Sequence, residues 1–213
     1  MRILIINPNS DERTCEIMAR KAKNMNLPDV EVDVTRCMKA PKLVCSYEEQ
    51  ASSGEEMVEI IRTTKDRYDA YIIACHSDPN LDLIREMAGS KPVVGIAEVS
   101  MKLAASMGNG YAVISPGLNS FSKKIALAHK YRCDDLLHTM KATKSDSNED
   151  LLEASKEAVK EFGVDCIVMG CANFANADGY IERELGIPVI DGVAAALFMA
   201  FGLVYYNRCK ERF

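Results

Sequence analysis

The sequence predicts an α/β fold with two pseudo-symmetric lobes, each built on a parallel sheet. Several short runs are apolar throughout rather than alternating, which is typical of parallel strands covered on both faces. Each run is followed by a stretch of helical character, as in chains that build parallel sheets. Landmarks also recur between the two halves with one offset, because 165−69, 171−75 and 188−92 each equal 96. Such an internal repeat predicts two similar lobes.

The first half is predicted to contain four strands alternating with helices. The strands are Arg2–Ile6, Val30–Thr35, Ala70–Ala74 and Pro92–Ile96, and the helices are Asp11–Asn24, Glu48–Arg67, Asp78–Ala88 and Glu98–Met107. Asp78 is a suitable N-cap for the third helix, and Pro79 fits its first turn. Gly108 can end the fourth helix in a left-handed conformation.

The second half follows the same order. Its predicted strands are Tyr111–Ser115, Val164–Gly170 and Pro188–Ile190. Four helices are predicted: one that starts near Leu118, then Leu151–Phe162 and Ala175–Leu185, and a final helix over 191–208. The polar segment Lys141–Asp150 is predicted to be a connecting loop. The division is therefore a first lobe over 1–108 and a second over 109–213, with the final helix expected to pack back on the first lobe.

Composition and charge exclude several classes of partner. A net charge of −5 without clustered Lys or Arg argues against nucleic acid and anionic membrane surfaces. The N-terminal apolar run is too short for a signal peptide and is better interpreted as a strand. The most apolar stretch, Val193–Tyr206, is interrupted by Gly202 and is shorter than the ~20 residues of a membrane span. We expect a cytoplasmic protein with a small-molecule substrate, and a homo-oligomer is left open.

Two of the eight cysteines occupy equivalent places in the repeat. Without a secretion signal, reduced thiols are expected. No CxxC pair occurs, and Cys166 and Cys171 point to opposite faces of a strand, so no metal is predicted. Cys75 and Cys171 each close a strand, at the edge where ligands bind in such sheets. The repeat predicts two thiols facing each other across a pseudo-two-fold axis, as acid and base on opposite faces of one carbon.

Polar loops follow the equivalent first strands of the two halves. They are Asn7–Ser10 and Ser115–Ser120, and neither carries a Walker lysine or a GxGxxG motif, so nucleotide binding is unsupported. Such loops can donate hydrogen bonds to the carbonyl oxygen of a carbanion, and the candidate donors are Asn9, Ser77, Ser115 and Asn173. His76 is interpreted as a pocket-wall residue, and the carboxylates of Asp78, Glu98 and Asp191 as helix caps.

These segments together resemble the hydantoin racemase family. The resemblance rests on Ile5–Ser10, on Ala74-Cys75 with Asp78-Pro79, on Pro92–Glu98, on Gly170–Ala172 and on Pro188–Val193, and it covers nearly the whole chain. That family belongs to the aspartate/glutamate racemase superfamily and includes allantoin racemases. The resemblance implies flavodoxin-like lobes, an active site in the interlobe cleft, no cofactor, and a catalytic thiol pair at Cys75 and Cys171.

The expected function is a cofactor-independent racemase of hydantoin or allantoin type, acting by 1,1-proton transfer between two cysteines. The expected substrate-binding residues are Asn9, His76, Ser77, Ser115, Pro116, Ala172 and Asn173. Departures from the family pattern at several of these positions leave the substrate side chain open. The alternatives are an amino-acid racemase, for which Arg13 is the nearest carboxylate clamp, a decarboxylase or cis–trans isomerase, and a non-catalytic binding protein with dispensable thiols.

Overall fold

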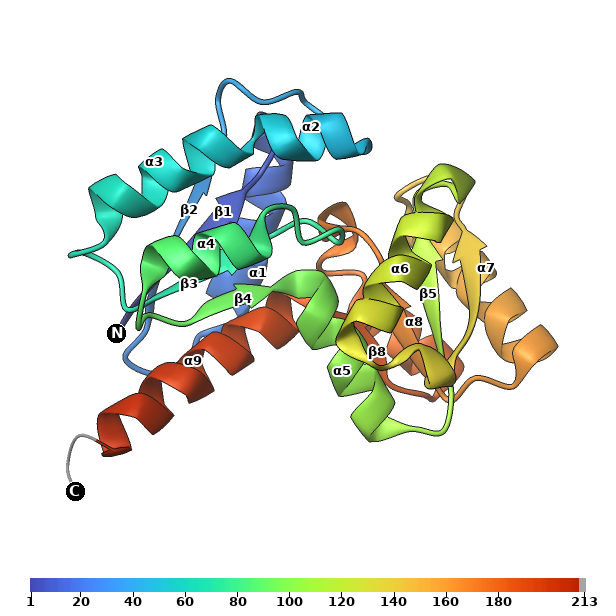
Figure 1. The fold of residues 1–213 in the computed structure, drawn as a ribbon. Coiled ribbons are helices and arrows are strands. Elements are labelled where there is room, and N and C mark those ends of the chain that lie inside the picture. The colour runs from blue at the N-terminus through green and yellow to red at the C-terminus, as the bar shows by residue number, and fades with distance from the viewer. Residues whose placement is uncertain (211–213) are drawn as a thin grey trace.

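Two four-stranded parallel sheets form the framework of the computed structural model, which describes residues 1–210 (Figure 1). The first sheet has the order β2-β1-β3-β4 and the second β6-β5-β7-β8, so the two topologies are the same. The strands are β1 (Arg2–Asn7), β2 (Glu31–Arg36), β3 (Ala70–Ile73), β4 (Val93–Gly95), β5 (Tyr111–Ser115), β6 (Leu137–Ala142), β7 (Cys166–Met169) and β8 (Val189–Asp191). The predicted α/β class with two parallel sheets is confirmed.

Helices connect successive strands in both lobes. They are α1 (Glu12–Met25), α2 (Tyr47–Ser52), α3 (Gly54–Thr64), α4 (Leu81–Ala88), α5 (Ile96–Met107), α6 (Phe121–Tyr131), α7 (Asn148–Phe162), α8 (Asp178–Leu185) and α9 (Gly192–Lys210). Three short 3₁₀ turns cover Leu118–Ser120, Asp134–Leu136 and Ala172–Phe174. The offset of 96 residues extends into this pattern, because α5 begins at Ile96 and α9 at Gly192.

Successive strand residues point into different hydrophobic clusters, as the twofold period of a strand requires. In β1, Ile3 and Ile5 face an inner cluster, whereas Leu4 and Ile6 face an outer cluster that includes residues of α3 and α4. The inner cluster continues into the second lobe through Tyr111 of β5. The outer face of the second sheet packs on α7 and α8. The two lobes therefore share one inner core, and each has an outer core of its own.

The helices that follow β4 and β8 cross between the lobes. α5 follows the last strand of the first sheet, yet it packs against α6, β7 and β8 of the second lobe. α9 follows the last strand of the second sheet and packs against α1, β3 and β4 of the first (Figure 1). An ion pair of 2.9 Å between Arg208 and Asp69 holds the far end of α9 to the first lobe. The division of the chain at residue 108 stays a prediction.

Three predicted elements differ from those in the structure. β6 lies where only a helix and a loop are expected, because it is an edge strand with mixed polar residues and lacks a continuous apolar run. The helix predicted over Glu48–Arg67 is two helices, α2 and α3, divided at Ser53. The helix predicted from Ala175 begins at Asp178, because a 3₁₀ turn occupies Ala172–Phe174.

Asp78 does not cap the helix that it precedes. Asp78 and Asn80 have φ angles of 43° and 57°, so the chain turns here and α4 begins at Leu81. The Asp78 carboxylate instead accepts the backbone N–H of Ala97 at 3.0 Å and of Glu98 at 2.7 Å. The predicted capping role is therefore met at the N-terminus of α5, through N–H groups 19 and 20 residues further along the chain.

α9 is longer than the sequence pattern suggests. It has 19 residues and is long and apolar enough to cross a membrane, by length and composition alone. The core helix of a globular protein passes the same test, and part of α9 is deeply buried here. Val193, Ala196, Leu197 and Ala200 are fully buried, whereas Phe198 is exposed. These buried side chains belong to the inner cluster shared by both lobes.

Gly170, at the end of β7, is expected to be intolerant of a side chain. The Cβ of an alanine there would lie 2.4 Å from the Ile114 carbonyl oxygen and 2.7 Å from Val113 Cγ1. Because the obstacle is backbone, Gly170→Ala is expected to lower the free energy of unfolding by about 2 kcal/mol. Gly179→Ala is the control, since nothing lies within 4 Å of its added Cβ. Urea denaturation of both variants provides the measurement, and equal midpoints would contradict the prediction.

Candidate active site

A cavity of about 220 Å³ opens between the lobes, at the carboxyl ends of the strands. Parallel α/β sheets bind ligands at this edge. The first lobe contributes residues that follow β1 and β3 and a loop before α2, and the second contributes residues that follow β5 and β7 together with part of α6. The residues that line the cavity include Asn9, Thr14, Cys45, Cys75, His76, Ser77, Pro116, Ser120, Lys124, Cys171, Ala172 and Asn173.

Cys75 and Cys171 both line this cavity, and their local surroundings repeat. Cys75 Sγ lies 3.1 Å from the hydroxyl oxygen of Ser77, two residues further on. The backbone N–H groups of Ser77 and Asn173 interact with the thiols of Cys75 and Cys171, which favours the thiolate in each case. The repeat seen in the sequence thus extends to the donor at the second position after each cysteine.

Burial raises the pKa of both thiols, in the direction opposite to the lowering that a helix N-terminus would cause. Each cysteine begins a single turn, closed by Asp78 N–H on the Cys75 carbonyl and Phe174 N–H on the Cys171 carbonyl. The nearest α-helices begin only at Leu81 and Asp178. Burial raises the pKa of Cys171 to about 11, against the opposing effects of the Asn173 N–H and Lys124. Burial likewise raises the pKa of Cys75, and Ser77 and Lys124 oppose it.

Asn9 and Asn173 are held at the cavity by polar contacts. The Asn9 side-chain oxygen accepts from Asn7 Nδ2 at 2.7 Å, and its position is thereby fixed by a buried neighbour. The Asn173 side-chain oxygen lies 2.7 Å from the hydroxyl of Thr14 on α1, which joins the two lobes at the cavity wall.

Ser115 differs from the expectation that its side chain donates to substrate, whereas His76 lies in the cavity wall. Ser115 is fully buried and does not line the cavity, because its hydroxyl points to Ser120 Oγ at 2.6 Å. His76 lines the cavity but is only 3% exposed. Its ring nitrogens face Ser100 Oγ at 3.2 Å and Lys124 Nζ at 3.1 Å. His76 therefore turns its polar atoms away from the thiols.

Lys124 and Cys45 are among the lining residues that the sequence prediction does not include. Lys124 of α6 is buried beneath the cavity, and Cys45 lies at its exposed side. The sequence could have indicated that Lys124 is buried, because its helical spacing places it on the same face of α6 as Ala128 and Tyr131, which are also buried. A lysine on an apolar face needs partners. Cys45 is on an irregular loop, where no periodic pattern predicts a neighbour.

The remaining charged candidates are occupied elsewhere. Arg13, the candidate carboxylate clamp, pairs with Asp146 at 2.8 Å and does not line the cavity. Asp191 accepts from Val193 N–H at 2.7 Å at the start of α9 and pairs with Lys21 at 3.1 Å.

Within residues 1–210, no group of three or more His, Cys, Asp or Glu side chains is arranged to hold a metal ion.

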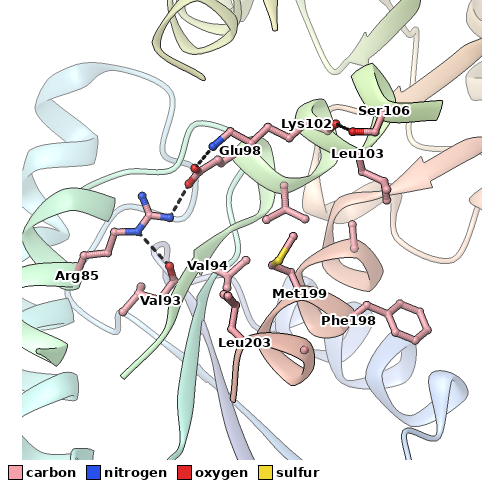
Figure 2. A pocket seen from close by; sticks show the side chains of 13 residues that line it. Arg85, Val93, Val94, Glu98, Lys102, Leu103, Ser106, Phe198, Met199 and Leu203 are labelled. Carbon is pink, nitrogen blue, oxygen red and sulfur yellow. Dashed lines mark hydrogen bonds and ion pairs between the residues drawn. The ribbon is translucent and has the colours of Figure 1, made fainter. Parts of the chain in front are cut away.

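A larger cavity of about 520 Å³ lies between α5 and α9 (Figure 2). Its walls are mainly apolar and include Val94, Leu103 and Met199. The charged side chains beside it pair with one another: Glu98 forms ion pairs with Arg85 at 2.6 Å and with Lys102 at 2.5 Å. None of its lining residues is a cysteine or histidine. The smaller cavity, with its two thiols, is therefore the better candidate for chemistry.

A family model described as Asp/Glu/Hydantoin racemase matches residues 3–200. The chain belongs to this racemase family. A hydantoin racemase from Paenarthrobacter aurescens is 31% identical, over 96% of this chain and 91% of the relative. A hydantoin racemase from a Pseudomonas species is 30% identical, over 96% of this chain and 86% of the relative.

Solved structures agree with this membership of the Asp/Glu/hydantoin racemase family. An allantoin racemase from Klebsiella pneumoniae has a TM-score of 0.92 and 27% identity, and the match covers 97% of this chain and 89% of the other. A glutamate racemase from Francisella tularensis has a TM-score of 0.69 and 18% identity, over 97% of this chain and 82% of the other. At that identity the likeness is one of fold alone. The family resemblance derived from the sequence is thus confirmed.

Proposed function

We propose that this racemase-family protein interconverts the enantiomers of hydantoin- or allantoin-type cyclic ureides without a cofactor. The observation that carries the proposal is the pairing of Cys75 and Cys171 in one interlobe cavity, with equivalent turns and donors behind each thiol. The names of the hydantoin and allantoin racemases to which the chain is similar support the substrate class.

The reaction needs a base on one face of the stereogenic carbon and an acid on the other. One cysteine, as thiolate, removes the proton of the C–H bond, and the electron pair is delocalised into the adjacent carbonyl. The other cysteine, as thiol, delivers its proton to the opposite face. Substrate of the opposite hand uses the same two groups in exchanged roles. The number of protons is conserved, and the enzyme ends each turnover with one thiolate and one thiol.

The surroundings of the thiols suit this cycle. Ser77 and the Asn173 N–H contact the sulfurs directly, and Asn9 offers an anchored polar group at the cavity wall. Pro116 and Ala172 line the cavity and add no charge. The free carboxylate clamp that an amino-acid substrate would require is not provided by Arg13, which is paired outside the cavity. Lys42 and Lys123 also line the cavity, so the preference for a cyclic ureide over a free amino acid rests on the names of the similar hydantoin and allantoin racemases.

Circular dichroism of single enantiomers tests the proposal. The panel contains 5-substituted hydantoins, allantoin, aspartate and glutamate, each followed with the protein as purified. The signal of at least one cyclic ureide is expected to decay to zero from either enantiomer, while the amino acids keep theirs. The doubly substituted Cys75→Ser, Cys171→Ser variant corrects for spontaneous racemisation. Mass spectrometry showing loss of carbon dioxide, or racemisation of the amino acids alone, would refute the proposal.

A further inference from the structure

Lys124 is a buried cation that links the two thiol-bearing loops. It is 4% exposed, and its Nζ donates to the carbonyl oxygens of Gly170 at 2.8 Å and His76 at 3.1 Å. Gly170 immediately precedes Cys171, and His76 immediately follows Cys75. A single ammonium from α6 therefore ties the backbone of both lobes beside the two sulfurs.

The hydrogen-bond chain beyond Lys124 determines the proton positions. An ammonium is a donor only, so the 3.1 Å contact to His76 Nδ1 requires that nitrogen to accept. The ring proton then sits on Nε2, which faces Ser100 Oγ at 3.2 Å. The Ser100 hydroxyl in turn donates to the Ile96 carbonyl at 2.6 Å. His76 is thereby neutral, and all three N–H groups of Lys124 meet an acceptor.

The electrostatics agree with this assignment. Burial and the Lys124 charge hold the pKa of His76 well below its ordinary value. Burial lowers the pKa of Lys124 to about 8, and the facing groups that oppose this are Cys171, Cys75, Asp78 and Cys45. Lys124 thus carries its proton at neutral pH. It is also a cation that acts on both thiols, in the direction opposite to burial.

We propose that Lys124, oriented by neutral His76, is a positioning residue whose positive charge stabilises the single thiolate shared between Cys75 and Cys171. One buried cation balances one thiolate, because Lys124 is the buried lysine of the cavity wall, whereas Lys42 is exposed and Lys123 is half-buried at the same wall. This arrangement favours the mixed thiol and thiolate state that a two-base racemase needs in both directions. The inference rests on the proposed function, because it concerns the same pair of sulfurs.

The test is the pH profile of alkylation of the two thiols by iodoacetamide, read peptide by peptide with mass spectrometry. Because the thiolate is the nucleophile, the rate reports its population. Lys124→Met is expected to slow alkylation of Cys75 and Cys171 at pH 7 about tenfold, equivalent to one pKa unit. Lys130→Met, an exposed position on the same helix, is the control and is expected to leave both rates unchanged. A profile for folded Lys124→Met that overlays on the wild type would overturn the inference.

Two further measurements protect the test against misfolding. Lys124→Gln keeps an amide that can donate to the two carbonyls but has no charge, so it is expected to behave like Lys124→Met. In the wild type itself, the alkylation profile is expected to flatten above about pH 8, where Lys124 loses its proton and the thiolate its counterion. A Lys124→Gln profile that overlays on the wild type would overturn the inference, as it would for Lys124→Met. No substrate is used, so alkylation and racemisation can fail independently.

Discussion

Replacing either Cys75 or Cys171 with serine is expected to reduce racemisation by about 10³-fold or more. A serine hydroxyl is too weak an acid to supply the base, and a positioned general acid or base contributes about 10²–10⁴-fold. The fold should be retained, because each thiol already lies at a cavity surface with donors that also suit a hydroxyl. Cys209→Ser, on the last turn of α9, is the matched control. A variant of either cavity cysteine that keeps most of the wild-type rate would exclude that thiol as a proton carrier.

The same variants separate the two thiols by isotope exchange in heavy water. Each cysteine sees one face of the substrate carbon, so the remaining thiolate should exchange the hydrogen of only one enantiomer and return deuterium without inversion. Cys75→Ser and Cys171→Ser are therefore expected to show opposite preferences, measured by NMR on each pure enantiomer. Exchange of the same enantiomer by both variants would show that the thiols do not act on opposite faces.

Replacing Asp78 with alanine is expected to lower the free energy of unfolding by about 3 kcal/mol. The carboxylate accepts from the N–H groups of Ala97 and Glu98 and from the Tyr131 hydroxyl at 2.7 Å. Its loss leaves three donors without their acceptor, two of them at the start of α5, and unpaired buried donors cost about 1–3 kcal/mol each before relaxation. Asp82→Ala, at an exposed ion pair with Lys130, is expected to cost less than about 0.5 kcal/mol. Equal urea midpoints for the two variants would contradict the prediction.

The pH dependence of the free energy of unfolding provides a second test of the burial of Asp78. Burial raises the pKa of Asp78 to about 6, from an ordinary value of 3.8, although its hydrogen bonds to Tyr131, Ala97 and Glu98 oppose the rise. The folded state therefore binds this proton more tightly than the unfolded state. The resulting stabilisation is complete below pH 3.8 and is lost as the pH rises through about 6. Asp78→Asn is expected to remove this part of the pH profile, and an unchanged slope between pH 4 and 6 would contradict the assignment.

The ends of the strands that carry the cysteines could be predicted from the sequence, because they depend on the local run of apolar residues. Apolar runs mark β3 and β7, and each strand ends two residues before its cysteine. The edge strand β6 has no such run, so its register depends on pairing with β5 rather than on its own composition. Ser115 was misplaced for a related reason. A loop motif indicates where a residue lies along the chain, whereas the direction of its side chain is set by the pleat and by Ser120.

Tertiary partners explain the other differences. Asp78 looks like the cap of the next helix, but its partners are 19 and 20 residues away in the sequence, across the sheet edge. Lys124 bonds to backbone carbonyls 48 and 46 residues away, and backbone atoms leave no trace in a residue pattern. The pKa values of the thiols followed burial, a property of the assembled cavity, rather than proximity to a helix terminus.

The crossing of α5 and α9 makes the chain the intramolecular counterpart of a domain-swapped dimer. The last helix of each half of the repeat packs on the sheet of the other half, and the two helices also pack on each other. They approach closely near Ile96 and Gly192, because a Cβ added to Gly192 would lie 3.2 Å from the Ile96 carbonyl oxygen. Rotating one lobe away from the other would pull both helices off their sheets at once. Substrate entry is therefore expected to proceed by small shear movements and by loop displacement, with the spacing of the two thiols preserved throughout the catalytic cycle.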